Sequence, residues 1–144
     1  YVNSYRRFMP DDAAPINLEW SVDNRSVGLR VPNSSPNARR VENRVAGIDC
    51  NPYLALAASL ACGYLGMTEK TKPSREYKGD AYEGSYGVPR GIQEALVAFN
   101  DCDPLQDLLG RQFSSIYQAL KAHEFDEFMK VVSPWEREHL LLTV

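Results

Sequence analysis

The sequence predicts an α+β fold, because β-like segments fill its first third and helical patterns fill most of the rest. Residues 16–22 alternate apolar and polar side chains, residues 26–31 continue in β-prone types, and the turn signal Asp23-Asn24 lies between them. A third extended segment is predicted over 39–45, after a loop rich in Pro, Asn and Ser. We therefore expect antiparallel strands first, the first two joined as a hairpin, and mostly helices afterwards.

A long helix is predicted where the spacing of apolar residues changes, at Asn51. Asn is a favoured N-cap, and Pro52 suits the first helical position. The predicted helix over 51–67 is apolar on nearly every face, so we expect it to be buried inside something larger. Residues 68–90 are polar and contain several Gly and Pro, which indicates a long surface connection.

More helices are predicted in the last third, and they cover 91–99, 104–123 with Asp103 as N-cap, and 124–132. A last short helix opens at Ser133-Pro134, where Glu136 completes a capping box. The apolar residues 140–144 that follow should dock on the chain's own core or on another subunit.

The composition excludes several classes of function. A chain of 144 residues that is 44% apolar and 24% charged has the size and mix of one compact domain. A net charge of −3 argues against a nucleic-acid partner or a membrane surface, and the apolar stretch 53–67 is too short to span a bilayer. Three widely spaced cysteines and two histidines indicate neither a disulfide framework nor a zinc site, which favours a cytoplasmic location.

Arginine dominates the beginning of the chain, where the first 44 residues contain seven Arg and no Lys. Side chains alternate faces along a strand, so Arg40, Glu42 and Arg44 should share one face of the segment 39–45. Arg presents a fixed fork of donors that grips carboxylate or phosphate, so this face suits an anionic substrate, with a metal held by Glu42. Surface salt bridges on an exposed sheet are an equally weighted interpretation.

A series of short motifs resembles the C-terminal part of the glutamine synthetase catalytic domain, in the family's order and close to its spacing. They are Asn3-Ser4-Tyr5-Arg6-Arg7-Phe8, Ala14-Pro15, Asn24-Arg25, Leu29-Arg30-Val31-Pro32, Ala38-Arg39-Arg40-Val41-Glu42-Asn43-Arg44 and Asn51-Pro52-Tyr53-Leu54. The resemblance is strong over residues 1–67 and loose to the end. It implies that 1–50 hold active-site strands and a flap loop, 51–67 a buried helix, 68–90 a surface connection and 91–144 the helical C-terminal region.

The resemblance also implies roles for five residues. Arg7 matches the position that binds the glutamate α-carboxylate, and Arg44 matches the one that contacts the side-chain carboxylate. Arg25 and Arg30 match arginines that hold ATP phosphates, and Arg25 also serves glutamate; Arg25 and Arg44 would thus be the catalytic residues. Glu42 matches a ligand of Mg²⁺ or Mn²⁺. The implied reaction is two-step: ATP phosphorylates the γ-carboxylate of L-glutamate, and an amine then attacks the acyl phosphate.

Departures from the family pattern bear on the amine. Members that make glutamine carry a flap-loop glutamate where this chain has Ala13, and the neighbouring Asp11 and Asp12 need not reach the same point. Ala13 and the ending around Trp135 look most like the γ-glutamylpolyamine (γ-glutamylputrescine) synthetase branch, so we expect putrescine or another polyamine. Glutamine synthetase proper, which uses ammonium, is the alternative. Asn37 replaces a lysine that commonly helps to hold ATP, which indicates a subtype difference.

Other chemistry-bearing residues are interpreted more simply. Tyr82 lies in a stretch comparable to one that can be adenylylated in bacterial members, but its neighbours match poorly and a surface tyrosine is expected. His123 and His139 are expected in structural or surface roles, and Cys62 as a small apolar residue of the buried helix.

The resemblance implies that most metal ligands and a further domain precede Tyr1, so this chain alone should be an inactive piece. The whole protein is expected to be a homo-oligomer, a ring-shaped dodecamer as in the family. Two alternatives to a ligase stay open: a non-catalytic segment with a structural or oligomerisation role, and an unrelated phosphate- or carboxylate-binding module.

Overall fold

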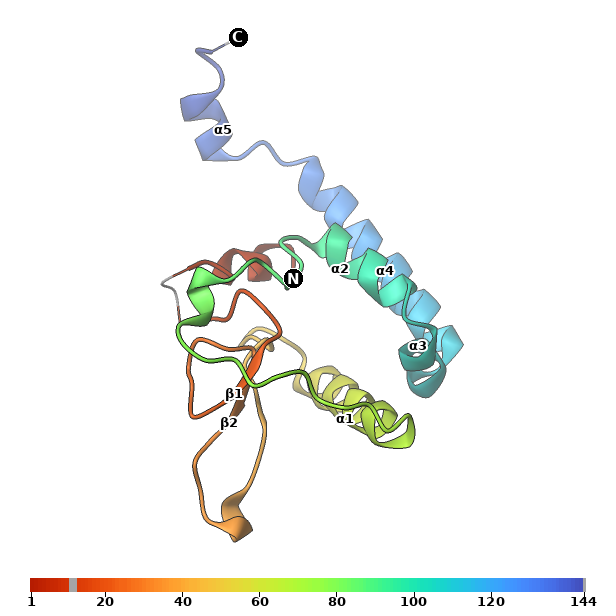
Figure 1. Cartoon of the computed structure of the whole chain (residues 1–144). Coiled ribbons are helices and arrows are strands. Elements are labelled where there is room, and N and C mark those ends of the chain that lie inside the picture. Colours follow the sequence, from red (N-terminus) through yellow and green to blue (C-terminus); the bar gives the residue numbers. More distant parts are fainter. Residues whose placement is uncertain (11–12, 144) are drawn as a thin grey trace.

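The computed structural model describes residues 1–10 and 13–143, and these form a small sheet region beside a group of helices (Figure 1). Asp11, Asp12 and Val144, on which parts of the flap-loop and C-terminal expectations depend, lie outside the described residues. In chain order the elements are η1 (Val2–Arg7), β1 (Trp20–Val22), β2 (Leu29–Val31), η2 (Pro36–Ala38), β3 (Glu42–Asn43), α1 (Pro52–Thr68), η3 (Ala81–Glu83), α2 (Ile92–Asn100), α3 (Asp103–Leu109), α4 (Arg111–Met129) and α5 (Pro134–His139). The α+β class is confirmed.

The sheet has the order β1-β2-β3, and its strands are much shorter than the sequence predicts. β1 and β2 pair in parallel, with Trp20 opposite Leu29, whereas β2 and β3 are antiparallel. The hairpin expected at Asp23-Asn24 is therefore wrong. The Asn24 side chain instead accepts from the Ser26 N–H and donates to the Gly79 carbonyl.

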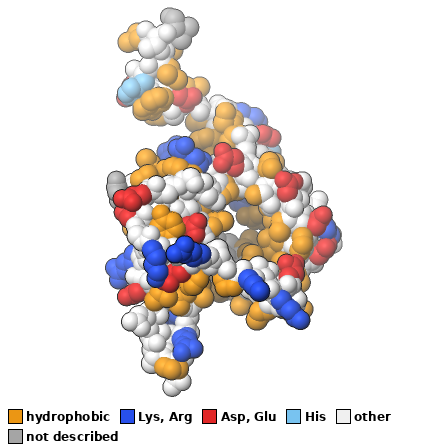
Figure 2. Space-filling model, in the orientation of Figure 1, with side chains coloured by type: hydrophobic (Ala, Val, Ile, Leu, Met, Phe, Trp, Pro, Cys, Tyr) orange, Lys and Arg blue, Asp and Glu red, His pale blue; other side chains and the backbone are white. Residues whose placement is uncertain are grey.

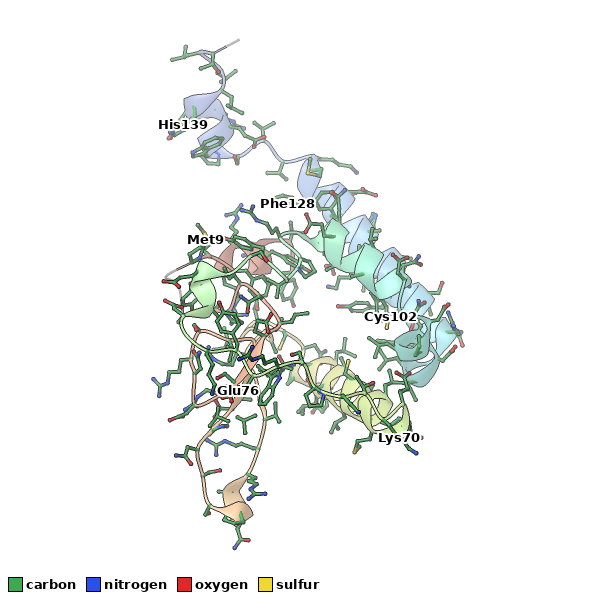
Figure 3. The ribbon with its side chains drawn as sticks, in the orientation of Figure 1. Met9, Lys70, Glu76, Cys102, Phe128 and His139 are labelled. Carbon is green, nitrogen blue, oxygen red and sulfur yellow. The ribbon has the colours of Figure 1, made fainter. Side chains whose placement is uncertain are left out.

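Residues 74–88, the crossing segment, run along the sheet region and are bonded to it repeatedly. Trp20 Nε1 donates to the Ser74 carbonyl at 2.8 Å, and the Gly87 N–H donates to the Ile16 carbonyl at 2.9 Å. Glu76, labelled in Figure 3, accepts from the Val22 N–H at 3.1 Å. The segment supplies the buried residues Ala81 and Val88, while most of its other residues are exposed.

The core of the described residues is small. Phe8, Ala14 and Val88 form one cluster, and Ile16 and Val27 are fully buried nearby. The core is small because much of the apolar side-chain surface of the described residues is not covered by the helices and strands of this chain. Figure 2 accordingly shows many apolar side chains exposed over the helical part.

Helix α1 begins as predicted, because the Asn51 side chain accepts from the backbone N–H of Tyr53 and Leu54 and Pro52 opens the helix. It packs on α3 but contains no buried residue. Leu60 is 72% exposed and Met67 is 74% exposed, and Cys62 is exposed as well. The described part of the chain thus covers α1 only in part, on the side that packs on α3, and burial of this helix in a larger structure stays a prediction.

The limits of helices α3 and α4 differ from the predicted ones, first of all at Gly110. Gly110 adopts a φ of +93°, which ends α3 and divides the single helix expected over 104–123. α4 then continues to Met129, through the point where a separate helix was expected, and Cys102 rather than Asp103 is the N-cap of α3. α2, α3 and α4 pack against one another.

Helix α5 carries the predicted capping box, in which Ser133 and Glu136 bond each other's backbone N–H. It extends away from the other helices (Figure 1). His139 stacks on Trp135 with ring centroids 4.8 Å apart, and both side chains are at the surface. Among the described residues, no helix is long and apolar enough to cross a membrane.

Candidate functional site

An open depression of about 790 Å³, which we call the arginine pocket, lies where three segments meet. The segments are the loop at Ala13, the connection after β1 and the crossing segment, and Arg44, which follows β3, completes the lining. Its lining residues are Ala13, Asp23, Asn24, Arg25, Ser26, Arg44, Gly79, Asp80 and Tyr82. Two of the predicted catalytic residues, Arg25 and Arg44, therefore face one space.

Arg44 is held in the pocket wall by carbonyl groups. Its guanidinium donates to the Ala13 carbonyl at 2.7 Å and to the Val27 carbonyl at 3.3 Å. Within residues 1–10 and 13–143 no carboxylate pairs with Arg44 or with Arg25. Carbonyls orient the Arg44 fork without neutralising it, so its charge is not cancelled by a described carboxylate and suits an anion.

Arg30 and Glu42 form the second group of predicted residues, beside the pocket. They lie opposite each other in the β2–β3 register, and Arg30 Nη1 donates to Glu42 Oε2 at 2.7 Å. Arg30 also binds Asp23, a pocket residue, while Arg40 donates to the other Glu42 oxygen at 3.1 Å. The bond from Arg30 holds the pKa of Glu42 below its usual value, and the bonds to Glu42 and Asp23 raise the pKa of Arg30.

The expected common face of Arg40, Glu42 and Arg44 is formed only in part. Arg40 pairs with Glu42, but β3 ends at Asn43 and the Arg44 side chain binds carbonyls of the pocket instead. Strand alternation assumes that the strand continues through Arg44, and here it does not. Asp23 connects the two groups, because it lines the pocket and pairs with Arg30.

The described residues do not by themselves fit a divalent metal. Mg²⁺ and Mn²⁺ require several oxygen ligands, and no group of three or more His, Cys, Asp or Glu side chains suited to a metal occurs in the described ranges. Glu42 is a single carboxylate whose two oxygens both accept from guanidinium groups. A metal at this position would need ligands from outside these residues.

Arg7 is not among the residues that line the pocket. Its guanidinium donates to the Val45 carbonyl at 2.6 Å and to the Arg44 carbonyl at 3.4 Å, so it braces the backbone that carries Arg44. Nearby, Ser4 donates to Asp49, which lowers the pKa of that carboxyl. Of the five predicted site residues, the structure brings Arg25 and Arg44 into the pocket lining, pairs Arg30 with Glu42, and bonds Arg7 to the backbone carbonyl of Arg44.

Six lining residues were given no role in the site from the sequence: Asp23, Asn24, Ser26, Gly79, Asp80 and Tyr82. Asp23 was interpreted as a turn residue and Tyr82 as a surface tyrosine. The signal for Asp80 and Tyr82 is weak, because they reach the pocket through contacts between segments about 55 residues apart in the chain. The turn-forming residue types around Gly79 predict a loop, but they do not predict which part of the structure that loop contacts.

Guanidinium groups gathered beside a small sheet suit the binding of phosphoryl and carboxylate groups. Residues 1–140 match the glutamine synthetase catalytic domain, so the chain belongs to this family. Over 97% of the chain it is 38% identical to gamma-glutamylputrescine synthetase PuuA of Escherichia coli and 36% identical to glutamine synthetase of Halobacterium salinarum. Over 94% it is 35% identical to glutamate–isopropylamine ligase of Pseudomonas.

A solved structure, "Apo GmaS without ligand", superposes with a TM-score of 0.82 at 28% identity and covers 97% of this chain. The chain spans about a third of each relative: 30% of the putrescine and isopropylamine enzymes, 33% of the glutamine synthetase and 32% of the solved chain. The relatives include glutamine synthetases as well as enzymes named for organic amines. They therefore do not favour the polyamine branch specifically.

Proposed function

We propose that the protein containing this chain is an ATP-dependent ligase that joins the γ-carboxylate of L-glutamate to an amine through γ-glutamyl phosphate. The observation that carries the proposal is the pair Arg25 and Arg44, which line one pocket without a carboxylate partner in the described part of the chain. Membership of the glutamine synthetase family supplies the reaction class.

The reaction has two balanced steps. A γ-carboxylate oxygen of glutamate attacks the terminal phosphorus of ATP, the bond to the bridging oxygen breaks, and ADP leaves. The amine nitrogen then attacks the acyl carbon, the bond to the phosphate oxygen breaks, phosphate leaves and the nitrogen loses a proton. Negative charge on the transferring phosphoryl group must be neutralised and positioned, which is what fixed guanidinium forks supply.

Each arginine is assigned a part in this reaction. Arg44 contacts the γ-carboxylate and Arg25 contacts both glutamate and the transferring phosphoryl group. Arg7 binds the α-carboxylate, and Arg30 binds an ATP phosphate. The assignments of Arg25 and Arg44 are supported by their place in the lining of one pocket. Arg30 is engaged with Glu42 and Asp23, so a phosphate would have to replace one of these carboxylates.

For the acceptor, we propose an organic amine, with putrescine or another polyamine first and ammonium as the alternative. Ala13 lines the pocket, and its carbonyl accepts from Arg44 at 2.7 Å. A methyl group there occupies less space than a glutamate and holds no charge that would bind a small ammonium ion. Relatives named for putrescine and for isopropylamine support an organic acceptor, while those named glutamine synthetase support ammonium.

We also propose that the protein works as a homo-oligomer, of the ring-shaped dodecameric type, in the cytoplasm where ATP is available. The uncovered apolar residues of α1 and of the segment after α5 support association with more protein, because exposed apolar patches of this kind mark contact surfaces. Glu42 would supply one ligand of a Mg²⁺ or Mn²⁺ site completed by residues outside the described ranges.

The test is a phosphate-release assay on the longest natural polypeptide that contains this chain. Glutamate and ATP are supplied with ammonium, isopropylamine or putrescine, and the γ-glutamyl product is identified by mass spectrometry. We expect product with an organic amine at a higher kcat/KM than with ammonium, and loss of product in Arg44→Gln but not in Arg75→Gln, an exposed arginine outside the pocket. Equal use of ammonium would establish glutamine synthetase instead, and no product with any amine would refute the ligase.

A further inference from the structure

The wall of the arginine pocket that the crossing segment forms carries a carboxylate, Asp80. We propose that Asp80 is a specificity residue, which binds the second, non-reacting ammonium group of a diamine acceptor. This inference rests on the proposed ligase function and concerns which amine the same site selects.

The position of Asp80 is fixed by its neighbour. Ala81 is fully buried, its N–H donates to Ser26 Oγ at 2.8 Å, and its carbonyl accepts from Asn17 Nδ2 at 2.8 Å. Asn24 holds the other side, because its Nδ2 donates to the Gly79 carbonyl at 2.8 Å. The backbone of Asp80 is therefore tied on both sides to the segment that carries Arg25.

The side chain of Asp80 is oriented by a local contact. Its Oδ1 accepts from the Tyr82 N–H at 3.0 Å, and no described residue bonds its Oδ2. No Lys, Arg or His of the described ranges forms an ion pair with it, whereas the other pocket carboxylate, Asp23, is paired with Arg30. Asp80 thus presents to the pocket a negative charge that no cation of the described residues pairs in a salt bridge.

The pocket has charge of both signs as a result. Arg25 and Arg44 suit the phosphoryl and carboxylate groups of the acyl donor, while Asp80 suits a cation. Ammonium and isopropylamine each have one nitrogen, which must react and cannot also remain bound to Asp80. A diamine has a second nitrogen for the carboxylate, and a space of about 790 Å³ is in the range that holds a small-molecule ligand.

The experiment compares putrescine with n-butylamine, which has the same carbon chain and one nitrogen, in Asp80→Asn. Asn is as good a cap as Asp, so this variant keeps the backbone contact and removes the charge. We expect kcat/KM for putrescine to fall about 10- to 100-fold, the range for a lost charged hydrogen bond, with n-butylamine little affected. Glu83→Gln, on the same short helix but outside the pocket lining, should leave the ratio of the two amines unchanged.

Other outcomes overturn the inference in distinguishable ways. An equal fall for both amines would show that Asp80 only maintains the loop, and an unchanged ratio would show that it does not contact the acceptor. Activity with ammonium alone would also refute it. If no amine reacts, the ligase proposal fails, and calorimetric titration of putrescine and n-butylamine tests the inference separately. Putrescine should then bind more tightly than n-butylamine, and Asp80→Asn should remove this difference. Equal binding of the two amines to the parent protein would refute the inference.

Discussion

Ser26→Ala is the most informative single change, because one hydroxyl links the crossing segment to the segment that carries Arg25. Ser26 Oγ accepts from the Ala81 N–H at 2.8 Å and donates to Asn24 Oδ1 at 2.7 Å. Ala81 is fully buried, so water cannot replace the missing acceptor without opening the structure. The substitution leaves a buried donor unpaired while it removes little apolar surface.

The expected magnitude follows from that unpaired donor. A buried polar group that loses its partner costs about 1–3 kcal/mol. If the cost is confined to opening of the crossing segment, the exchange rate of the Ala81 amide should rise by about 5-fold to 140-fold, because each 1.4 kcal/mol corresponds to a factor of ten.

Hydrogen–deuterium exchange with mass spectrometry on peptides covering 79–86 measures this directly. Ser85→Ala is the matched control, since Ser85 is exposed on the same segment and should leave the exchange unchanged. Because Asp80 and Tyr82 flank Ala81, the same loosening should lower kcat/KM for the acceptor amine. Exchange at Ala81 within twofold of the parent protein would show that this hydrogen bond does not hold the segment, and would refute the reasoning.

Three further results are expected. Gly28→Ala should lower the free energy of unfolding, measured by thermal unfolding, by about 1–3 kcal/mol, because the added Cβ would lie 2.5 Å from the backbone oxygen of Asn17. Gly63→Ala is the control and should cause no such loss, because its Cβ would meet nothing within 4 Å. Carbon NMR should find the pKa of Glu42 below its usual value, because Arg30 donates a hydrogen bond to its carboxylate. As the folded pKa is the lower one, ionised Glu42 stabilises the folded state at neutral pH, and this contribution is lost as the pH falls below about 4.3. Glu42→Gln should therefore make the free energy of unfolding less dependent on pH in that range. Ser133→Ala should cost about 1 kcal/mol of local stability and speed amide exchange within α5, while an unchanged rate would show that the capping box is not formed in solution.

Local signals in the sequence predicted the starts of α1 and α5. Asn51 and Ser133 cap α1 and α5 as expected, because a cap depends on residues two or three positions away. The single helix expected over 104–123 was wrong, since the positive φ of Gly110 is a backbone choice that apolar spacing does not reveal. The parallel pairing of β1 and β2 was missed because turn residues do not specify where the chain returns.

The sequence predicted which arginines to examine at the candidate site, but not which other segments lie beside them. The absence of lysine and the family motifs both pointed to Arg25 and Arg44, and these residues do line one pocket. Asp80 was missed because its position depends on the bonds of Ala81 to Ser26, across 55 residues of chain. A side chain's role in a site depends on such long-range contacts, so the individual roles of the arginines stay predictions.

The measurement that tests the central claim most directly is the fate of an oxygen atom. Glutamate labelled with ¹⁸O in its γ-carboxylate is incubated with ATP, the preferred amine and the longest natural polypeptide containing this chain, and the released phosphate is analysed by mass spectrometry. A γ-glutamyl phosphate intermediate predicts that one labelled oxygen appears in inorganic phosphate for each amide formed, and that Arg44→Gln reduces amide and labelled phosphate together. Amide formation with unlabelled phosphate, or with the label in AMP, would contradict the account.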